Sequence, residues 1–363
     1  MKFTATKSNL VKLLTRCATI ARPKSPSPVL ACVLLEATSD RLQGSATDTY
    51  QEISTSVPID GTKPGQVAVS AKDLLDRVKS LPDGPVTFDT PKDKLIVTAG
   101  KRKHTLPILS VDHFPKISPP PNAGITMPKE ELATLFQKTK FAIAHDDIGK
   151  PALRGVLLEF EDGRIYATTT DGHRLSFASF ERGNVEKGKS RVVPLAAIDS
   201  LLSFLVDDDD VLVSTTDDTA SFAMQDLCYA TKLIAEEFPP FRHVFGTEPP
   251  HRSVIDKQQW LDSIGSVEKA SPEGDHRGFL KLSFAPGVCH VSAQGKGAAE
   301  DELEAVYNGP EFVIGVYHRY LAEAIAACDS ERVRLSVGGE LDPIWVRPDT
   351  GDELLGVVMP ARL

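Results

Sequence analysis

The chain has 363 residues, of which 25% are charged and 41% are hydrophobic, and its formal net charge is −9 at pH 7. This composition is typical of a globular protein with two or three domains, each long enough to bury a core. It excludes a membrane-spanning chain, because no run of eighteen apolar residues occurs. The net charge alone argues against binding of nucleic acid.

The cysteines and the first residues indicate the compartment. The segment that opens the chain, MKFTATKSNL, has no apolar stretch of the kind found in a secretory signal. The cysteines are far apart, odd in number and without CxxC spacing, so we expect reduced, mostly buried thiols in a cytoplasmic protein. They are Cys17, Cys32, Cys228, Cys289 and Cys328.

The predicted elements recur along the chain. Apolar residues at helical spacing predict helices over 8–20, 70–81, 128–143, 194–205, 256–267 and 317–328. A similar strand-like segment lies between the two helices of each pair, at 31–36, 154–159 and 277–282. Val33, Val156 and Phe279 hold the same place in these segments, and each step is 123 positions (33 to 156 and 156 to 279).

This spacing predicts an internal repeat. Pro-rich linkers, PPPNAG at Pro119 and TEPPHR at Thr247, separate the copies. We therefore expect three similar domains over 1–118, 124–247 and 252–363, each with two helices and several strands.

The middle copy carries the most distinctive segment, from Arg154 to Phe180. It predicts two strands joined by an Asp-Gly turn within EDGR, followed by TDGHRL from Thr170 to Leu175. One interpretation of TDGHRL is catalytic, with Asp171 orienting His173 as the general base of a hydrolase. The other is a tight turn in which Gly172 supplies a positive φ, because no nucleophile motif accompanies the pair.

Other motifs predict no bound group. The acidic run from Asp207 to Asp210 lacks the spacing of a calcium loop and reads as a solvated loop. No phosphate-binding glycine motif and no zinc spacing occur. We expect no metal and no cofactor.

Basic residues gather on the predicted helices. Lys12 and Arg16 are four apart, Lys72 and Lys79 are seven apart, and Lys101 opens the basic segment KRKH. Acidic residues concentrate elsewhere, as in Glu300 to Glu304. The pattern fits either a mixed solvated surface or a molecule with one basic face and acidic outer edges.

The whole chain resembles the bacterial sliding clamp family, the beta subunit of DNA polymerase III. MKFT at the start, RGVLLEFE and ATTTDGHRLS in the middle, KLI before FP at 232–239, and VVMPARL at the end carry the resemblance. It implies an α+β fold of three clamp-type domains, with two helices of each lining a pore and antiparallel sheets outside. It also implies a head-to-tail homodimeric ring that encircles duplex DNA without reading sequence, and that has no catalytic activity.

The resemblance assigns residues to three surfaces. The DNA-facing residues would be Lys12, Arg16, Arg22, Lys72, Arg77, Lys79, Lys138, Lys140 and Arg319. A groove between the second and third domains would bind a Gln-Leu-x-Leu-Phe-like peptide of the polymerase alpha subunit, the clamp loader and repair proteins. Its residues would be Leu153, Thr170, Gly172, His173, Arg174, Leu175, Pro239, Val244, Val357 and Met359, with Tyr320, Leu341 and Pro343 as neighbours. The dimer contact would join Lys101, Arg102 and Lys103 to Glu300, Asp301, Glu302 and Glu304.

The chain departs from the family pattern at the groove and at the dimer edge. FPPF replaces the usual FPDY, His243 stands where an arginine is common, and Lys269-Ala270 lies where paired apolar residues are usual. A specialised paralogue of the replicative clamp, with altered partners, is therefore the alternative function, beside the hydrolase.

Overall fold

The computed structural model describes residues 1–145, 149–183, 185, 188–206, 210–270, 278–295, 297–307, 309–351 and 353–362. The acidic residues 207–209, Arg277 and Leu363 lie outside these described residues. The chain divides into two compact units, Met1–Lys129 with Ala196–Leu233 (unit 1) and Glu130–Leu195 with Ile234–Leu363 (unit 2).

Each of the six predicted helical segments forms an α-helix. They are α1 (Lys7–Ile20), α2 (Ala71–Lys79), α3 (Lys129–Thr139), α4 (Leu195–Phe204), α5 (Lys257–Val267) and α6 (His318–Ala326). Short 3₁₀ turns occur at η1 (Pro28–Ala31), η2 (Val111–His113), η3 (Lys140–Ala142), η4 (Pro151–Arg154), η5 (Arg242–Val244) and η6 (Glu268–Ala270). None of the helices within the described ranges is long and apolar enough to cross a membrane.

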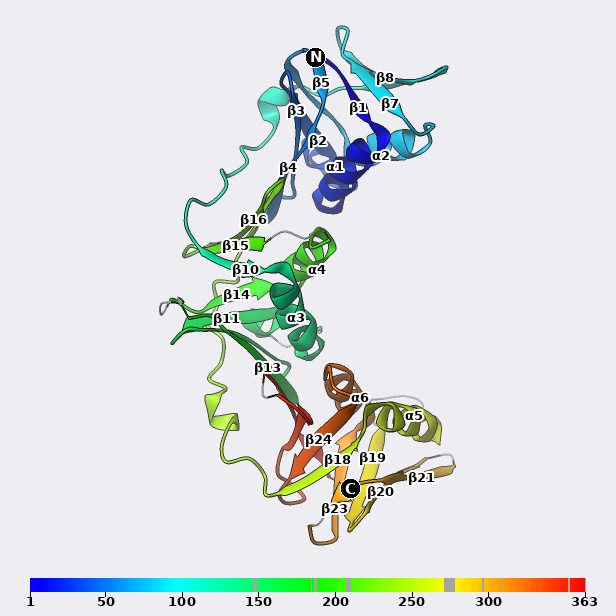
Figure 1. Ribbon diagram of the computed structural model, residues 1–363, viewed down its shortest axis with the longest axis vertical. Coiled ribbons are helices and arrows are strands. Elements are labelled where there is room, and N and C mark those ends of the chain that lie inside the picture. Colours follow the sequence, from blue (N-terminus) through cyan, green and yellow to red (C-terminus); the bar gives the residue numbers. More distant parts are fainter. Residues whose placement is uncertain are drawn as a thin grey trace. The chain divides into compact units, whose positions relative to one another are not determined.

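The first helix shows why these segments fold as they do. Thr6 caps α1, since its hydroxyl accepts a hydrogen bond from the backbone N–H of Asn9 at 3.3 Å. Leu10, Leu13 and Cys17 follow at helical spacing and are fully buried. This buried stripe packs α1 against α2 and against one face of a sheet (Figure 1).

Unit 1 contains two antiparallel sheets. One has the strand order β5-β1-β7-β8-β9 and the other β10-β15-β16-β17-β4-β3-β2-β6. The bounds are β1 (Lys2–Thr6), β2 (Cys32–Ala37), β3 (Arg41–Thr47), β4 (Gln51–Pro58), β5 (Asp60–Lys63), β6 (Gly65–Ser70), β7 (Pro85–Asp89), β8 (Lys94–Ala99), β9 (Arg102–Pro107), β10 (Ile125–Pro128), β15 (Asp210–Thr215), β16 (Thr219–Met224) and β17 (Leu227–Lys232).

Unit 2 also contains two antiparallel sheets. Their orders are β14-β11-β12-β13-β26-β25-β24-β18-β22 and β21-β20-β19-β23-β27. The bounds are β11 (Gly155–Glu161), β12 (Arg164–Thr170), β13 (Arg174–Glu181), β14 (Arg191–Pro194), β18 (His251–Asp256), β19 (Phe279–Ala285), β20 (Val288–Gln294), β21 (Ala298–Glu304), β22 (Val306–Tyr307), β23 (Phe312–Tyr317), β24 (Arg332–Val337), β25 (Ile344–Pro348), β26 (Leu354–Val358) and β27 (Pro360–Ala361).

The strand pairing repeats three times, in agreement with the predicted threefold repeat. The strand before the first helix of each repeat pairs with the strand after its second helix, namely β1 with β7, β10 with β15, and β18 with β24. The strand before the second helix pairs with the first strand of the intervening hairpin, namely β6 with β2, β14 with β11, and β23 with β19. The α+β class and the threefold repeat are therefore confirmed.

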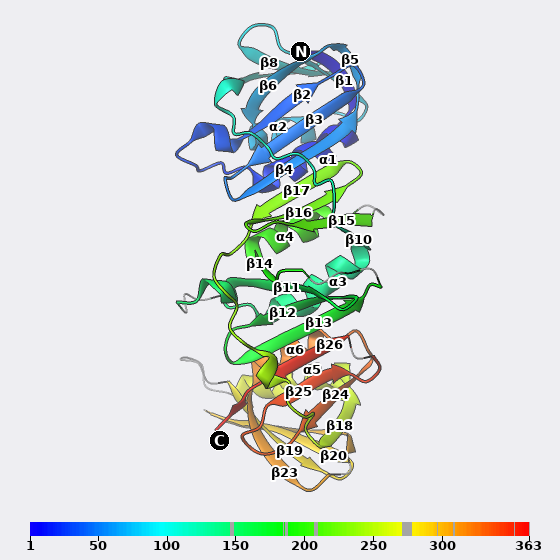
Figure 2. The same ribbon diagram turned by 90° about the vertical axis from the view of Figure 1, so that its left-hand side faces the viewer.

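Consecutive repeats are joined by continuous sheets. β4 of the first repeat pairs with β17 of the second, which we call the first junction. β13 of the second repeat pairs with β26 of the third, which we call the second junction. Figure 2 shows both pairs of neighbouring strands. The first junction lies wholly in unit 1 and the second wholly in unit 2.

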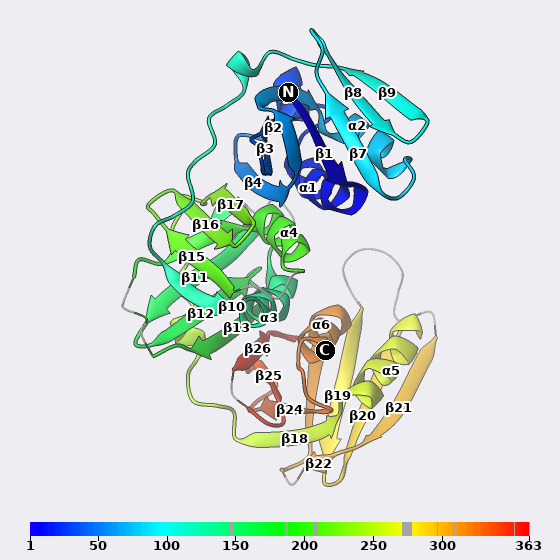
Figure 3. The ribbon, with the colours of Figure 1, turned by 45° about the horizontal axis from the view of Figure 1, so that its top comes forward.

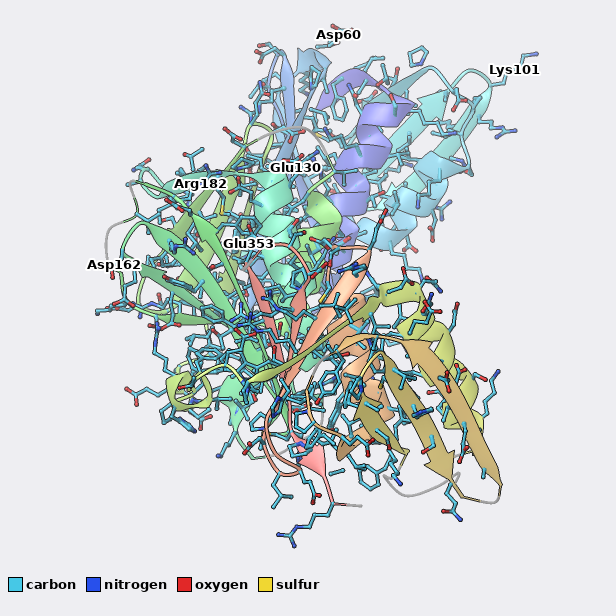
Figure 4. The ribbon with its side chains drawn as sticks, turned by 60° about the horizontal axis from the view of Figure 1, so that its bottom comes forward. Asp60, Lys101, Glu130, Asp162, Arg182 and Glu353 are labelled. Carbon is cyan, nitrogen blue, oxygen red and sulfur yellow. The ribbon has the colours of Figure 1, made fainter. Side chains whose placement is uncertain are left out.

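The distinctive middle segment has one more strand than the two predicted. Asp162 and Gly163 form the turn between β11 and β12 with φ of 50° and 74°, which is the geometry of an Asp-Gly hairpin turn. Figure 4 labels Asp162 at the tip of this hairpin. A third strand, β13, follows the turn of TDGHRL and pairs with both β12 and β26. The motif therefore connects β12 to β13 beside the second junction.

Candidate functional site

TDGHRL forms a tight turn that is closed by its own side chains. The Asp171 carboxylate accepts hydrogen bonds from the backbone N–H groups of His173 (2.9 Å) and Arg174 (3.1 Å). The Thr170 hydroxyl donates to the carbonyl of Arg174 at 2.6 Å and accepts from the N–H of Gly172 at 3.1 Å. Gly172 has φ of 93°, a conformation that glycine adopts without strain. The structural interpretation of the motif is confirmed.

Arg174 anchors this turn to the third repeat. Its side chain is almost fully buried, and its guanidinium donates to Asp171 at 2.9 Å and to Glu323 on α6. The same guanidinium lies 4.4 Å from the ring centroid of Tyr320. Burial raises the pKa of Glu323, but hydrogen bonds from Arg319 and Arg174 outweigh this effect and leave that pKa below its ordinary value. A charged cluster therefore fixes the turn.

The catalytic interpretation finds no support in this arrangement. One oxygen of Asp171 is engaged by two backbone N–H groups and the other by Arg174. The imidazole of His173 instead stacks on Tyr320, with ring centroids 6.2 Å apart. A general base needs a partner that orients its ring, and Asp171 is committed to the turn.

A groove of about 220 Å³ lies beside this turn, and its walls belong to unit 2. It brings together most of the predicted groove residues, namely Leu153, Thr170, Gly172, Arg174, Leu175, Pro239, Val244, Val357 and Met359. It also includes Lys150, Pro240, Phe241 and His243. The sequence had singled out Pro240, Phe241 and His243 as departures from the family pattern, whereas no sequence feature indicated that Lys150 would line the groove.

Aromatic packing holds one wall of the groove, the segment 238–245 that precedes the TEPPHR linker. Phe241 meets Phe238 and Phe245 edge-on, with ring centroids 5.9 and 5.5 Å apart. Phe241 belongs to an apolar cluster with Leu175, Trp345 and others on the face of the second-junction sheet. This packing fixes the backbone on either side of Pro239, as an edge of a preformed groove requires.

The predicted groove residue His173 and the three predicted neighbours lie outside the groove lining. His173 and Tyr320 stack on each other beside it, and the backbone carbonyl of His173 accepts from the N–H of Met359 at 2.9 Å. Leu341 is 64% exposed and lines a separate cavity of about 490 Å³ with Glu340 and Arg362. Pro343 lines neither of these two cavities.

Most of the predicted DNA-facing residues are accessible. Lys72, Arg77 and Lys79 are exposed on α2, Lys140 is exposed in η3, and Arg319 is exposed on α6. Lys12 is half-buried and lies 3.0 Å from Asp226, and Arg22 is exposed and lies 3.0 Å from Asp48. These side chains remain able to reach an anion.

The prediction is wrong for Arg16 and Lys138, because both are buried. Arg16 is 7% exposed and donates to Thr55 at 2.9 Å and to Asp226 at 3.0 Å. Lys138 is 9% exposed, and its ammonium lies 2.6 Å from Asp329. Burial and pairing with protein carboxylates argue against a DNA-facing role for these two side chains.

The predicted dimer residues lie on two free sheet edges. β9 is the last strand of its sheet in unit 1, and β21 is the last strand of its sheet in unit 2. Lys101, Arg102, Lys103, Glu300, Asp301, Glu302 and Glu304 are all exposed. Figure 4 labels Lys101 at the tip of the hairpin that leads into β9, and Figure 3 shows β9 at the border of its sheet.

The five cysteines are free thiols, and Cys17, Cys32, Cys289 and Cys328 are buried. Burial raises the pKa of Cys17 to about 12 and that of Cys228 to about 11. Such thiols are protonated at neutral pH, as expected for structural cysteines. No cluster of metal-binding side chains occurs among the residues that the structure describes.

Comparison with known proteins agrees with this architecture. Residues 1–118, 126–240 and 242–362 match the N-terminal, central and C-terminal domains of the family described as DNA polymerase III beta subunit. Proteins named beta sliding clamp from Pseudomonas aeruginosa and Escherichia coli K12 are 29% and 25% identical, over the full length of both chains. A crystal structure of the DNA polymerase sliding clamp from Pseudomonas aeruginosa superposes with a TM-score of 0.93 at 27% identity, again covering both chains completely. The chain therefore belongs to the DNA polymerase III beta subunit family.

Proposed function

We propose that this chain is a DNA sliding clamp, a two-chain ring that encircles duplex DNA and tethers a replicative polymerase without catalysis or a cofactor. The full-length similarity to proteins named beta sliding clamp supports this function. The structural observation that carries the ring is the pairing of strands from one repeat to the next, together with the charges on the two free edges.

Ring closure follows from the pattern of the two junctions. The last strand of the second repeat pairs with β4 of the first, and the last long strand of the third pairs with β13 of the second. By the same rule, β9 of the first repeat pairs with β21 in the third repeat of another copy. Two copies joined head to tail through two such contacts form a closed ring.

The side chains on these edges are complementary. Leu106 on β9 and Leu303 on β21 are buried, so the alternate positions of each strand face the other side of its sheet. A shared sheet with both leucines toward the core places Lys103 beside Glu300, Glu302 or Glu304. Opposite charges across strands favour pairing and fix its register, and salt weakens them.

DNA contact in such a ring depends on phosphates. Exposed cations on inward helices bind phosphate oxygens of any sequence, which is the interaction that a sliding protein needs. Arg22, Lys72, Arg77, Lys79, Lys140 and Arg319 are the exposed members of the predicted set. We exclude Arg16 and Lys138 from this role because of their burial.

The groove beside TDGHRL is the proposed docking site for partner peptides of the polymerase, the clamp loader and repair proteins. Leu175, Val244 and Val357 offer apolar surface for hydrophobic side chains, and the exposed Lys150 and His243 supply polar groups. A volume of about 220 Å³ is below the roughly 300–1,000 Å³ of a pocket for a whole small molecule. It suits two anchoring side chains of a peptide.

The alternative is a clamp paralogue with altered partners, and one observation favours it. Pro240, Phe241 and His243, which depart from the family pattern, all line the groove. A groove wall changed at three positions predicts a changed peptide preference. Affinity for a Gln-Leu-x-Leu-Phe peptide separates the two: tight binding supports the replicative clamp, and loss of binding by an intact dimer supports the paralogue.

The ring itself is tested by its mass and by its behaviour on DNA. Sedimentation over a range of protein and salt concentrations should give about twice the 39.3 kDa of one chain, with dissociation at high salt. After loading, the protein should remain on circular DNA and leave linear DNA through its ends. A strict monomer, or equal retention on both DNAs, would contradict the ring.

A further inference from the structure

The first junction contains a second copy of the TDGHRL turn. There, Thr47-Asp48-Thr49-Tyr50-Gln51 connects β3 to β4. The Thr47 hydroxyl donates to the carbonyl of Gln51 at 2.8 Å and accepts from the N–H of Thr49 at 3.0 Å. The Asp48 carboxylate accepts from the N–H groups of Tyr50 (2.9 Å) and Gln51 (2.7 Å). These four hydrogen bonds match those of Thr170 and Asp171 one for one.

The strands beside the two turns also share a register. Gln51 pairs with Thr231 at the first junction, as Arg174 pairs with Val358 at the second. The next residue along then donates from its backbone N–H to the turn: Lys232 to the carbonyl of Tyr50 at 2.8 Å, and Met359 to that of His173 at 2.9 Å. Lys232 therefore stands where the groove has Met359, and Glu52 stands where it has Leu175.

At the first junction the cation Lys232 and the acid Glu52 replace the apolar groove residues Met359 and Leu175, and the turn carries an aromatic side chain, Tyr50. Tyr50 is 61% exposed. The Arg22 guanidinium and the Lys232 ammonium lie 5.9 and 5.5 Å from its ring centroid. Arg22 lies just after Ala21, the C-cap of α1, and pairs with Asp48, which is itself buried in the turn. A rigid turn thus presents one aromatic ring that positions two cations on the surface.

We propose that Arg22, Tyr50 and Lys232 form a docking point for the phosphate backbone of a nucleic-acid strand. This inference rests on the proposed DNA clamp and adds Tyr50 and Lys232 to its contacts. Two exposed cations close together suit phosphate oxygens, and neither reads a base. A docked protein segment is the less favoured occupant. The two positions that correspond to the apolar groove residues Leu175 and Met359 carry charged side chains here, so no hydrophobic anchor is offered.

The salt dependence of DNA binding tests this site. Fluorescence anisotropy of the full-length chain with labelled duplex DNA is measured from low to moderate salt for the parent and for Lys232→Ala. The slope of log affinity against log salt is negative, and one lost phosphate contact should make it shallower by about 0.9. Tyr50→Phe should keep parental affinity because the ring is retained, whereas Tyr50→Ala should weaken binding because both cations lose their support. Lys63→Ala, an exposed lysine on β5, is the matched control for charge loss.

The outcomes separate this site from the clamp itself. A parent chain that binds no DNA at any salt concentration would contradict the DNA-binding function. A parent that binds DNA, with an unchanged slope for Lys232→Ala or an equal change for Lys63→Ala, would overturn the docking point alone. Unchanged DNA binding together with weaker binding of a Glu-rich peptide by Lys232→Ala would assign the site to an acidic protein segment and overturn the phosphate proposal.

Discussion

The guanidinium of Arg16 on α1 donates to the carboxylate of Asp226 in the β16–β17 turn at 3.0 Å, although 210 positions separate the two residues in sequence. Arg16 also donates to Thr55 on β4. This single side chain therefore contacts both the first and the second repeat at the first junction. Lys12 lies 3.0 Å from the same carboxylate. This cluster therefore adds polar side-chain contacts to the strand pairing that joins the first and second repeats.

Arg16→Ala should destabilise unit 1 by about 3 kcal/mol, because it removes the donor to the buried Thr55 and one of the two cations that pair with the partly buried Asp226. Denaturant unfolding followed by circular dichroism measures the loss. Lys7→Ala is the control, since Lys7 pairs with the exposed Asp83 and should cost under about 1 kcal/mol. Equal losses for the two variants would mean that the Arg16 cluster contributes no more than a surface pair.

The same cluster should make stability depend on pH. Burial raises the pKa of Asp226, but the hydrogen bonds and charges of Lys12 and Arg16 outweigh it and hold that pKa below the ordinary 3.8. Its stabilisation is therefore present above pH 3.8 and is lost as pH falls through the lower folded pKa. Asp226→Asn should be less stable than the parent at pH 7, with a difference that shrinks in acid. A difference that grows in acid would contradict this sign.

Met359→Glu should abolish peptide binding and leave the fold intact. The side chain is 42% exposed at the groove, so a carboxylate there stays hydrated while removing an apolar contact. Fluorescence polarisation with a labelled Gln-Leu-x-Leu-Phe peptide measures binding, and a thermal melt checks the fold. Leu341→Glu is the matched control, because Leu341 is more exposed and lines a different cavity. Unchanged affinity of Met359→Glu would remove the groove assignment.

The two copies of the turn predict opposite effects of glycine. Thr49 has φ of 80°, a strained conformation for a β-branched residue, whereas Gly172 has φ of 93°. Thr49→Gly should raise the unfolding midpoint, because relief of about 1–3 kcal/mol of strain exceeds the entropy lost by glycine. Gly172→Ala should lower the free energy of unfolding by about 1 kcal/mol, and with it the midpoint, through backbone strain alone, since a Cβ there meets no atom within 4 Å. Two changes of the same sign would contradict this account.

Charge reversal tests the dimer edge. Lys103→Glu should raise the dimer dissociation constant roughly tenfold, because each of the two β9–β21 contacts in the ring would then place like charges opposite each other. Glu302→Lys in the same chain should restore the dimer, which sedimentation equilibrium would detect. If the double variant is as weak as the single one, the two residues do not meet.

The sequence predicted local structure well and long-range burial poorly. The spacing of Leu10, Leu13 and Cys17 set the position of α1, and the 123-residue period set the repeat, because both are properties of neighbouring residues or of self-similarity. Lys12 and Arg16 are four apart and share a helix face, which favoured one role for both. Both pair with the distant Asp226, but Arg16 also donates to Thr55 and is buried, whereas Lys12 stays half-exposed. Likewise, nothing near Lys138 in sequence announces Asp329 as its partner.

The groove illustrates the same limit. TDGHRL and VVMPARL could be recognised as short motifs, and the structure brings Gly172 and Met359 to one cavity. Lys150 has no distinctive neighbours, so its place in the lining depends on tertiary structure alone. The pairing of β13 with β26 also could not be read from either strand, because an apolar alternating strand can pair with many others.

The junction sheets have a consequence for how this chain can be divided. A cut in the linker at Pro119 would pass between repeats in sequence but would separate β4 from β17 in space. The released first repeat would then have two unpaired sheet edges, β4 in one sheet and β9 in the other. Exposed edges recruit strands from other molecules. A fragment trimmed at the linkers should therefore self-associate or precipitate. A usable truncation would have to keep β16 and β17 together with the first repeat, whose sheet they extend.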